Sequence, residues 1–322
     1  MGVYILRRFL QLIPTLLIVS VIVFFMARLT PGDPVILKMG VQANLPENRE
    51  VVERLRHEMG LDKPMVVQYL IWFGSVLRGD LGNSYWSGLP VVSLIAGRLP
   101  ATIQLMLTTI IFSLFISLPV GILAAVKRGS LFDKGLMLFS VAGLAVPIFW
   151  LGLTLILFFA VRLQILPASG YVSFREEPLE SIRRSILPTL ALATREIAVF
   201  TKFLRAEMIE VLQQDYIRVA KAKGLSRHVV LLRHALKNAF VPFVTVVGLE
   251  IGALISGVVI VEQVFGWSGV GWLALQGVLN RDYTMVQAMV LFVAVLYVVV
   301  NLVVDIAYAW LDPRVREEMI GA

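Results

Sequence analysis

Four uninterrupted apolar stretches constrain this 322-residue chain more than any other feature of its sequence. None contains a charged residue, and they cover residues 9–27, 99–126, 135–161 and 283–304. A helix needs about 20 predominantly apolar residues to cross the roughly 30 Å hydrocarbon core of a bilayer. Charged residues make up 16% of the chain, whereas soluble domains carry about 25%. The sequence therefore predicts an integral membrane protein.

Two further stretches have the length of a span but contain charge. Residues 185–204 include Arg195 and Glu196, and residues 239–261 include Glu250. With these, we expect an all-α integral membrane protein with six transmembrane helices. Ionisable groups inside a span are costly to bury and usually face the interior of the bundle. Glu250 and Arg195 are therefore candidates to line a translocation path, whereas Glu196 is expected at a shifted helix boundary.

The connections between the expected spans differ in charge. Residues 127–134 hold three Lys or Arg against one acid and residues 202–237 hold eight against three, while the other connections are balanced. Cytoplasmic loops carry an excess of Lys and Arg, so both segments and both termini are predicted to be cytoplasmic. The first apolar stretch is too long for a cleaved signal peptide and is expected to remain as the first span.

Several classes of function are disfavoured by what the sequence lacks. It has no cysteine and only three widely separated histidines, so neither a disulfide framework nor a zinc site is expected. No Ser/His/Asp or paired-carboxylate constellation indicates an enzyme, and no catalytic or metal-ligating residue is predicted. An ion-coupled secondary transporter would show inverted repeats and buried midplane acids, which six spans with one central acid fit poorly.

The connection after the first span is about 70 residues long, too long to be bare loop in a compact protein. Apolar residues recur at helical spacing before Gly60 and again before Gly79, which predicts two short amphipathic helices. We expect an outer-face helical insertion that either caps the bundle or contacts an external partner. The predicted division is 1–98 for the first span and this region, 99–312 for the transmembrane core, and 313–322 for a cytoplasmic tail.

The basic segment 206–240 also carries a helical pattern. A first helix is expected to stop at Gly224, because glycine adopts the left-handed cap conformation without steric strain, and Ser226 could cap the next helix. The first helix has an apolar stripe of Met208, Leu212, Val219 and Ala222, and the second one of Val229, Leu232, Leu236 and Phe240. This predicts a helix, a break, a short helix and then the fifth span. The pattern fits a lipid anchor, a regulatory tether or a docking element for a soluble partner.

Residues 215–226, DYIRVAKAKGLS, resemble the cytoplasmic coupling signature of ABC-type import permeases. The form is that of the dipeptide/oligopeptide/nickel family; the general signature begins Glu-Ala-Ala, where this chain has Arg218, Val219 and Ala220. Further similarity is spread along the chain, in LTPGDP (29–34), GLDKP (60–64), GDLG (79–82), RLPAT (98–102), VFGWSGVG (264–271), NLVVD (301–305) and LDPR (311–314).

The resemblance implies a type I ABC importer permease, acting in ATP-driven import across the bacterial cytoplasmic membrane. Such a permease pairs with a similar second permease, two cytoplasmic ATP-binding subunits and an external solute-binding protein, in contact with membrane lipid and not with nucleic acid. This chain lacks a Walker A loop. It is therefore expected to bind no cofactor, with ATP and Mg²⁺ held by the partner subunits.

The coupling residues implied by the resemblance are Arg218, Ala220, Ala222, Gly224, Leu225, Ser226, Arg227, Val229, Leu232 and Arg233. Leu225, Val229 and Leu232 would fill a groove on the ATPase. Arg227 and Arg233 would either set the register by charge or serve only the membrane topology. The expected cargo is di- or oligopeptides, with nickel chelates, glutathione or oligosaccharides as alternatives.

Overall fold

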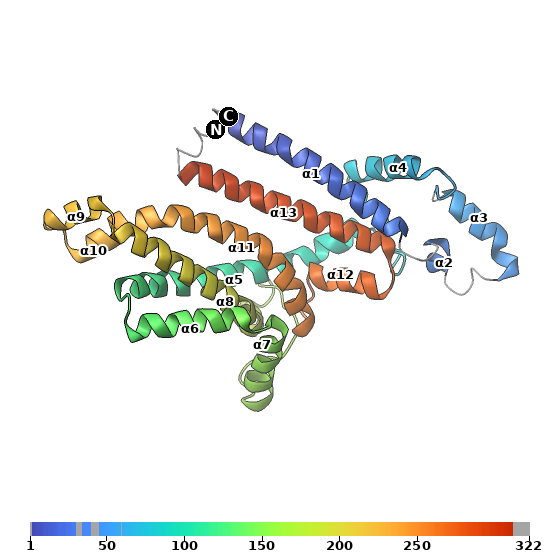
Figure 1. The fold of residues 1–322 in the computed structure, drawn as a ribbon. Helices are drawn as coiled ribbons and strands as arrows, with labels where there is room; N and C mark the ends of the chain where they lie inside the picture. Colours follow the sequence, from blue (N-terminus) through green and yellow to red (C-terminus); the bar gives the residue numbers. More distant parts are fainter. Residues whose placement is uncertain (1, 30–33, 40–44, 59, 312–322) are drawn as a thin grey trace. The chain divides into compact units, whose positions relative to one another are not determined.

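The computed structural model describes residues 2–29, 34–39, 45–58 and 60–311. Among these residues all regular elements are helical (Figure 1), and β pairing is limited to one isolated bridge between Asn83 and Pro90. The expected all-α architecture is therefore confirmed for the described chain. Contacts divide it into two compact units, the first made of Met1–Arg7, Ala101–Ser268 and Val299–Ala322, and the second of Arg8–Pro100 and Gly269–Val298.

The first unit is built around α8 (Pro178–Leu212). This helix packs against α6 (Leu131–Ala145), α7 (Ile148–Leu155) and α11 (Lys237–Val264). A helix that is covered on several sides is expected at the centre of a bundle. The unit also contains most of α5 (Val91–Val126), the π-helix η3 (Ile156–Arg162) and the elements of the basic segment described below.

Four helical stretches of the described chain are long and apolar enough to cross a membrane: Leu10–Leu29 in α1 (Gly2–Leu29), Val91–Val126, Arg227–Val264, and Tyr283–Val304 in α13 (Tyr283–Leu311). A fifth is counted if Leu131–Ala145 and Ile148–Arg162 form one span. α8 does not qualify by composition because it carries too many charged residues. The count of six therefore remains a prediction.

The stretch expected as the third span, residues 135–161, is divided between two helices, because the chain bends by 101° between α6 and α7. The bend lies at Pro147, which cannot donate a backbone hydrogen bond and whose ring disfavours a helical conformation in the preceding residue. Val146 accordingly has ψ 124°, outside the helical range.

The second unit contains both short helices that the apolar spacing predicts, α3 (Arg49–Glu58) and α4 (Met65–Leu77). None of the residues of α3 is buried. α4 packs on α1, where the Tyr69 and Ser20 hydroxyls lie 2.9 Å apart and the rings of Tyr69 and Trp72 contact Phe24. The TPGDP turn and the 313–322 tail lie largely or wholly outside the described residues.

The remaining elements of this unit are α2 (Pro34–Met39), the 3₁₀ turn η2 (Pro46–Asn48), α12 (Val270–Leu279) and the first part of α13. Asp282, at the start of α13, is buried. Its carboxylate accepts hydrogen bonds from the Ser84 hydroxyl at 2.6 Å, the Trp86 N–H at 3.3 Å and the Met285 N–H at 3.0 Å. One side chain therefore fixes the loop between α4 and α5 to the beginning of α13.

Candidate functional site

The basic segment of the first unit breaks at Gly224, as predicted. Helix α9 (Asp215–Ala222) ends just before it, and Gly224 has φ +78°, in the left-handed region that favours glycine. The chain then re-enters helical structure at α10 (Arg227–Val229), which continues through the π-helix η4 (Val230–Leu236) into α11. The glycine thus turns the chain between two helices.

Three details of the prediction are wrong. The helix expected over 206–223 is two helices, because α8 ends at Leu212 and α9 starts at Asp215. The hydroxyl of Ser226 makes no capping hydrogen bond; instead its backbone carbonyl accepts from Val230 N–H at 3.0 Å. The expected short helix before the fifth span does not end, since Arg227–Val264 is continuous.

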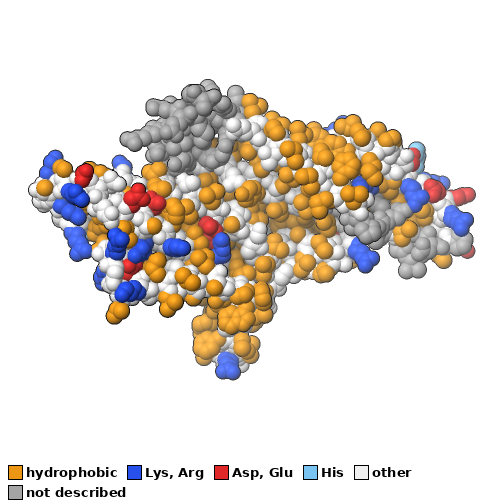
Figure 2. Space-filling view, viewed as in Figure 1, with side chains coloured by type: hydrophobic (Ala, Val, Ile, Leu, Met, Phe, Trp, Pro, Cys, Tyr) orange, Lys and Arg blue, Asp and Glu red, His pale blue; other side chains and the backbone are white. Residues whose placement is uncertain are grey.

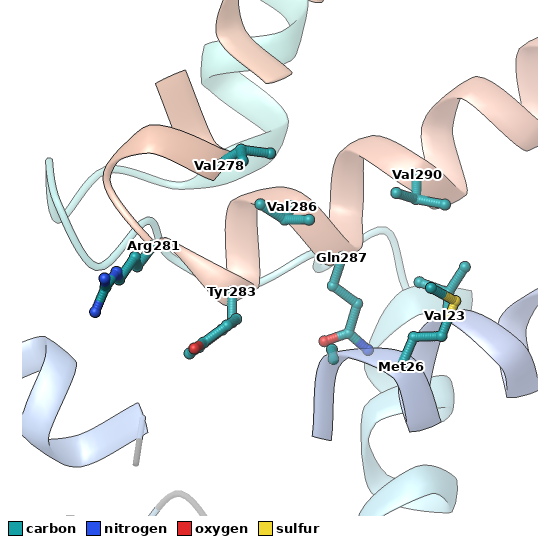
Figure 3. A pocket seen from close by; sticks show the side chains of 9 residues that line it. Val23, Met26, Val278, Arg281, Tyr283, Val286, Gln287 and Val290 are labelled. Carbon is teal, nitrogen blue, oxygen red and sulfur yellow. The ribbon is translucent and has the colours of Figure 1, made fainter. Parts of the chain in front are cut away.

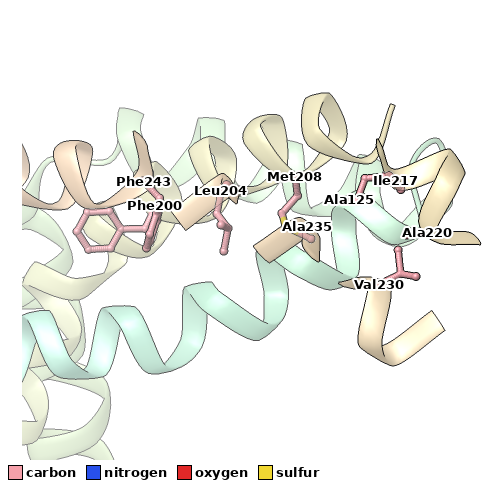
Figure 4. Close-up of a cluster of buried hydrophobic side chains, with 10 residues drawn as sticks. Ala125, Phe200, Leu204, Met208, Ile217, Ala220, Val230, Ala235 and Phe243 are labelled. Carbon is pink, nitrogen blue, oxygen red and sulfur yellow. The ribbon is translucent and has the colours of Figure 1, made fainter. Parts of the chain in front are cut away.

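The new break after Leu212 has a physical reason in the packing of α9. The expected stripe would have buried Val219, yet this side chain is 52% exposed. α9 instead buries Ile217 and Ala220. These belong to an apolar cluster with members from α5, α8, η4 and α11 (Figure 4): Ala125, Phe200, Leu204, Met208, Ile217, Ala220, Val230, Ala235, Ala239 and Phe243. Burial of these side chains outweighs continuation of α8 as a straight helix.

The coupling residues that the resemblance implies differ in burial. Ala220 is buried in the cluster, so its side chain packs inside the unit and anchors α9. Leu225 and Leu232 are 40% and 43% exposed, and Val229 is half-buried. The remaining members are all exposed: Arg218, Ala222, Gly224, Ser226, Arg227 and Arg233. Figure 2 shows Lys and Arg side chains gathered where Figure 1 draws α9 and α10. The segment thus presents apolar side chains within a basic surface.

A cavity of about 450 Å³ lies beside this surface. Lys221, Leu225 and Arg227 line it from the segment, together with Val126 at the end of α5 and Leu212 at the end of α8. Its lining is mostly apolar and includes two cations, Lys221 and Arg227. Sequence patterns did not indicate it, because its walls come from three separate parts of the chain.

A carboxylate fixes the neighbouring turn to α8. Asp133 is buried and pairs with Arg205, whose Nη2 lies 2.7 Å from Asp133 Oδ2. The same carboxylate accepts from Gly129 N–H at 2.9 Å, and the Ser130 hydroxyl caps α6 by accepting from Asp133 N–H. The basic turn 127–134 is thus part of the same packed region.

The two charges proposed for a translocation path are brought together. Arg195 Nη1 on α8 lies 2.6 Å from Glu250 Oε2 on α11 and 3.0 Å from Glu196 Oε1. Glu196 is not at a helix boundary, as expected from sequence, but buried in the middle of α8. Arg195 is 43% exposed, so its guanidinium joins two carboxylates on one side and reaches the surface of the unit on the other.

Sequence reasoning missed other polar contacts in this unit. The amide of Asn238 donates to the Tyr216 hydroxyl at 2.7 Å, which ties α9 to α11. Glu262, expected in a loop, is fully buried within α11 and accepts from the Thr102 hydroxyl at 2.6 Å. The Trp267 indole donates to the Ala101 carbonyl at 2.9 Å. The sequence did show Glu262 at the end of an apolar run and the VFGW stretch after it. Neither feature indicates which distant residue forms the hydrogen bond.

Comparisons with known proteins agree along the whole chain. The family model described as "binding-protein-dependent transport system inner membrane component" matches residues 117–317, and the corresponding N-terminal model matches residues 1–106. A probable peptide ABC transporter permease of Sinorhizobium fredii is 41% identical, over 98% of this chain and 100% of that protein. The oligopeptide transport system permease AppB of Bacillus subtilis is 42% identical, with the same coverage. The dipeptide transport system permease DppB of Escherichia coli K12 is 38% identical, over 98% of this chain and 99% of that protein.

Solved structures show the same fold at low sequence identity. A subunit of the inward-facing MetNI methionine ABC transporter aligns with a TM-score of 0.56 and 16% identity, covering 68% of this chain and 96% of that one. An amino acid ABC transporter aligns with a TM-score of 0.51 and 15% identity, covering 69% of this chain and 94% of that one. Together with the family match, these likenesses show that the chain belongs to the binding-protein-dependent transport system inner membrane components, as a multi-pass, non-catalytic permease subunit of an ABC importer.

Proposed function

We propose that this permease imports di- or oligopeptides, and that the segment 206–240 couples it to a cytoplasmic ATPase. The peptide cargo is supported by the names of the full-length relatives, which are peptide, oligopeptide and dipeptide permeases. The coupling role is supported by one observation above others. Exposed Leu225 and Leu232 stand among exposed arginines on a segment whose base is anchored in a buried apolar cluster.

The proposed topology has six spans, with α8 as the additional one. At 35 residues, α8 is about 52 Å long, enough to cross a bilayer. Its charges do not argue against a span, because buried Glu196 and the neighbouring Glu250 share Arg195. A helix at the centre of a bundle faces other helices more than lipid, so its composition need not be as apolar as that of the outer helices.

The proposed orientation places both termini and the coupling segment in the cytoplasm and the helices α3 and α4 outside. Excess Lys and Arg in 127–134 and 202–237 support it. The chain has no cysteine, so single introduced cysteines report on sidedness. A membrane-impermeant maleimide should label Arg54→Cys in intact cells, and Ser226→Cys only after the membrane is opened. Labelling of Ser226→Cys in intact cells would show that the proposed orientation is wrong.

The proposed assembly contains a second, similar permease, two ATP-binding subunits and an external binding protein, surrounded by lipid. ATP and Mg²⁺ are held by the ATP-binding subunits, because this chain has no Walker A loop. Closure of these subunits moves the coupling segments. For this chain, a groove on the ATPase receives Leu225, Val229 and Leu232, and Arg227 and Arg233 set the register by charge.

Co-purification with the cognate ATPase subunit tests the coupling role. Leu232→Asp places a carboxylate in the expected apolar contact, and Gly224→Pro forbids φ +78° because proline fixes φ near −65°. Both should lose ATPase binding and uptake. Leu131→Asp is the matched control, since Leu131 is 87% exposed and lies outside the segment. Normal binding and uptake by the two segment variants would refute the coupling assignment.

Uptake by a strain lacking this permease, complemented with wild type, tests the cargo. Restored uptake of labelled di- and oligopeptides, and not of nickel, glutathione or oligosaccharides, is the expected result. Restored uptake of one of the other solutes without peptide uptake would replace the peptide assignment and leave the permease role unchanged.

A further inference from the structure

A polar cavity of about 470 Å³ lies within the second unit, away from the coupling segment in sequence. Its walls come from the end of α1, from α4, from the loop before α5 and from the start of α13. The volume falls within the range of about 300–1,000 Å³ typical of small-molecule sites. Neither the family match nor the coupling role gives this cavity a function.

One wall of the cavity carries a cation that no carboxylate in the described part of the chain neutralises. Arg28 lies near the end of α1, and its guanidinium sits 5.4 Å from the centre of the Phe24 ring. Tyr85, which also lines the cavity, does not compensate the charge, because burial raises the pKa of its phenol and keeps it protonated at neutral pH. The guanidinium is therefore available to a carboxylate ligand.

A carboxylate side chain also lines the cavity. Asp80 lies in the loop after α4, and its Oδ1 accepts a hydrogen bond from Gly82 N–H at 2.8 Å, which fixes the direction of the carboxylate. Among the described residues, neither Arg28 nor Asp80 takes part in an ion pair. An unpaired cation and an unpaired anion in one cavity fit a ligand that carries both charges.

Two amide side chains in the cavity wall have an unused atom. Gln68 Oε1 is buried without a hydrogen-bond partner among the described residues, while its Nε2 donates to the carbonyls of Lys63 and Leu61 at 2.8 and 3.3 Å. Gln287 Nε2 is likewise buried and without a partner there. Buried polar groups are normally hydrogen-bonded. Turned toward the cavity, this acceptor and this donor would match the N–H and C=O of a peptide unit.

A second cavity in this unit has different chemistry. It measures about 590 Å³ and is lined mainly by apolar side chains (Figure 3), including Val23, Met26, Val278, Val286 and Val290. Gln287 contributes to both cavities. The apolar cavity has a single charged residue in its lining, Arg281, whereas the polar cavity offers charges of both signs.

We propose that the polar cavity binds a short zwitterionic peptide, with Arg28 contacting the terminal carboxylate and Asp80 the terminal ammonium. Gln68 and Gln287 bond the peptide unit, and the Trp72 ring lines the side of the site. The inference rests on the proposed peptide cargo and outward orientation, and it assigns this permease a peptide site of its own in addition to that of the binding protein.

Calorimetric titration of the purified full-length chain in nanodiscs tests the site with three probes: Ala-Ala, N-acetyl-Ala-Ala and Ala-Ala-amide. Arg28→Gln should weaken Ala-Ala binding about tenfold and leave Ala-Ala-amide unchanged, since that probe has no carboxylate. Asp80→Asn should weaken Ala-Ala binding about tenfold and leave N-acetyl-Ala-Ala unchanged, since that probe has no ammonium. Asparagine keeps the acceptor for Gly82 N–H, so the loop is preserved.

Arg54→Gln and Glu58→Gln are the matched controls, because both residues are exposed on α3 and neither lines the cavity. They should bind Ala-Ala like wild type. Absence of Ala-Ala binding, equal binding of all three probes, or wild-type affinity in both cavity variants would overturn the proposal.

Transport by the complete complex in proteoliposomes separates this inference from the proposed function. If wild type imports peptides and both cavity variants have wild-type Ala-Ala affinity and uptake, the cavity assignment is wrong while peptide import stands. The expected crossed pattern is that each cavity variant weakens binding of Ala-Ala but not of the probe that lacks the charge it contacts. If wild type imports no peptide but the probes bind in this pattern, the cavity assignment stands and the cargo assignment is wrong. Reduced uptake together with the crossed pattern supports both.

Discussion

The proposed coupling segment of the first unit and the loop around Asp282 in the second are held mainly by different forces. The coupling segment rests on an apolar cluster from four parts of the chain. The loop is held by one buried carboxylate that accepts from Ser84, Trp86 and Met285. Apolar packing is non-directional and tolerates small rotations, whereas hydrogen bonds fix distance and angle. The comparison indicates one region suited to movement under load and another suited to keeping a fixed shape.

The largest expected effect tests the packing side of this comparison. Ile217 is fully buried in the cluster, so Ile217→Ala should lower the free energy of unfolding of the chain by about 3 kcal/mol. Denaturant titration in detergent measures it. Val219→Ala, on the exposed face of the same helix, should change it by less than about 0.5 kcal/mol. Equal effects would show that α9 is not anchored by the cluster.

The polar side of the comparison is tested by Asp282→Asn. The substitution keeps the shape but leaves a buried donor facing other donors, and it should destabilise the chain by about 2 kcal/mol. Its effect should be greatest on hydrogen exchange of the loop between α4 and α5, and small in α9. Glu58→Gln, on exposed α3, is the control. Uniform loss of protection in both units would contradict a local role for Asp282.

Two glycines of similar backbone conformation sharpen the contrast. Gly224 has φ +78° with open space where a Cβ would be, so Gly224→Ala should destabilise by about 1 kcal/mol through backbone strain alone. Gly82 has φ +82°, and a Cβ there would lie 2.8 Å from Thr284 Cγ2. Gly82→Ala should therefore destabilise by about 2 kcal/mol or more. Thermal unfolding of the two variants gives the order, and the reverse order would contradict the tight fit of the loop.

The smallest expected effect concerns two serines at helix starts in the first unit. Ser226 makes no capping hydrogen bond through its side chain, so Ser226→Ala should change the free energy of unfolding by less than about 0.5 kcal/mol. Ser130 does cap its helix, and Ser130→Ala should lower it by about 1 kcal/mol. A larger loss at Ser226 would mean that its hydroxyl stabilises the segment by a contact other than a cap.

The sequence predicted features that depend on local pattern. Apolar runs located the long helices, spacing before Gly60 and Gly79 located α3 and α4, and Gly224 marked a break because few other residues adopt its backbone conformation. These signals lie within one turn or one element, so no knowledge of distant contacts is needed.

The sequence failed where distant contacts decide. Val219 and Ile217 are equally apolar, and only the position of η4 and α8 determines that Ile217 is the buried one. The burial of Glu196 within α8 could not be predicted from its position in the sequence. It depends on Arg195 pairing with both Glu196 and Glu250, and Glu250 approaches Arg195 only in the folded bundle. The bend at Pro147 depends on distant contacts in the same way, since proline permits a kink but packing sets the angle.

The unbroken run from Arg227 to Val264 has a mechanical consequence. Its 38 residues make a rod about 57 Å long, which carries Leu232 near one end and Glu250 along its shaft. Torque applied at the base turns the whole rod, and a tilt of roughly 5° sweeps the far end through about 5 Å. In the proposed coupling mechanism, work done by the nucleotide cycle would thus reach the membrane interior by leverage, without a relay of side-chain rearrangements.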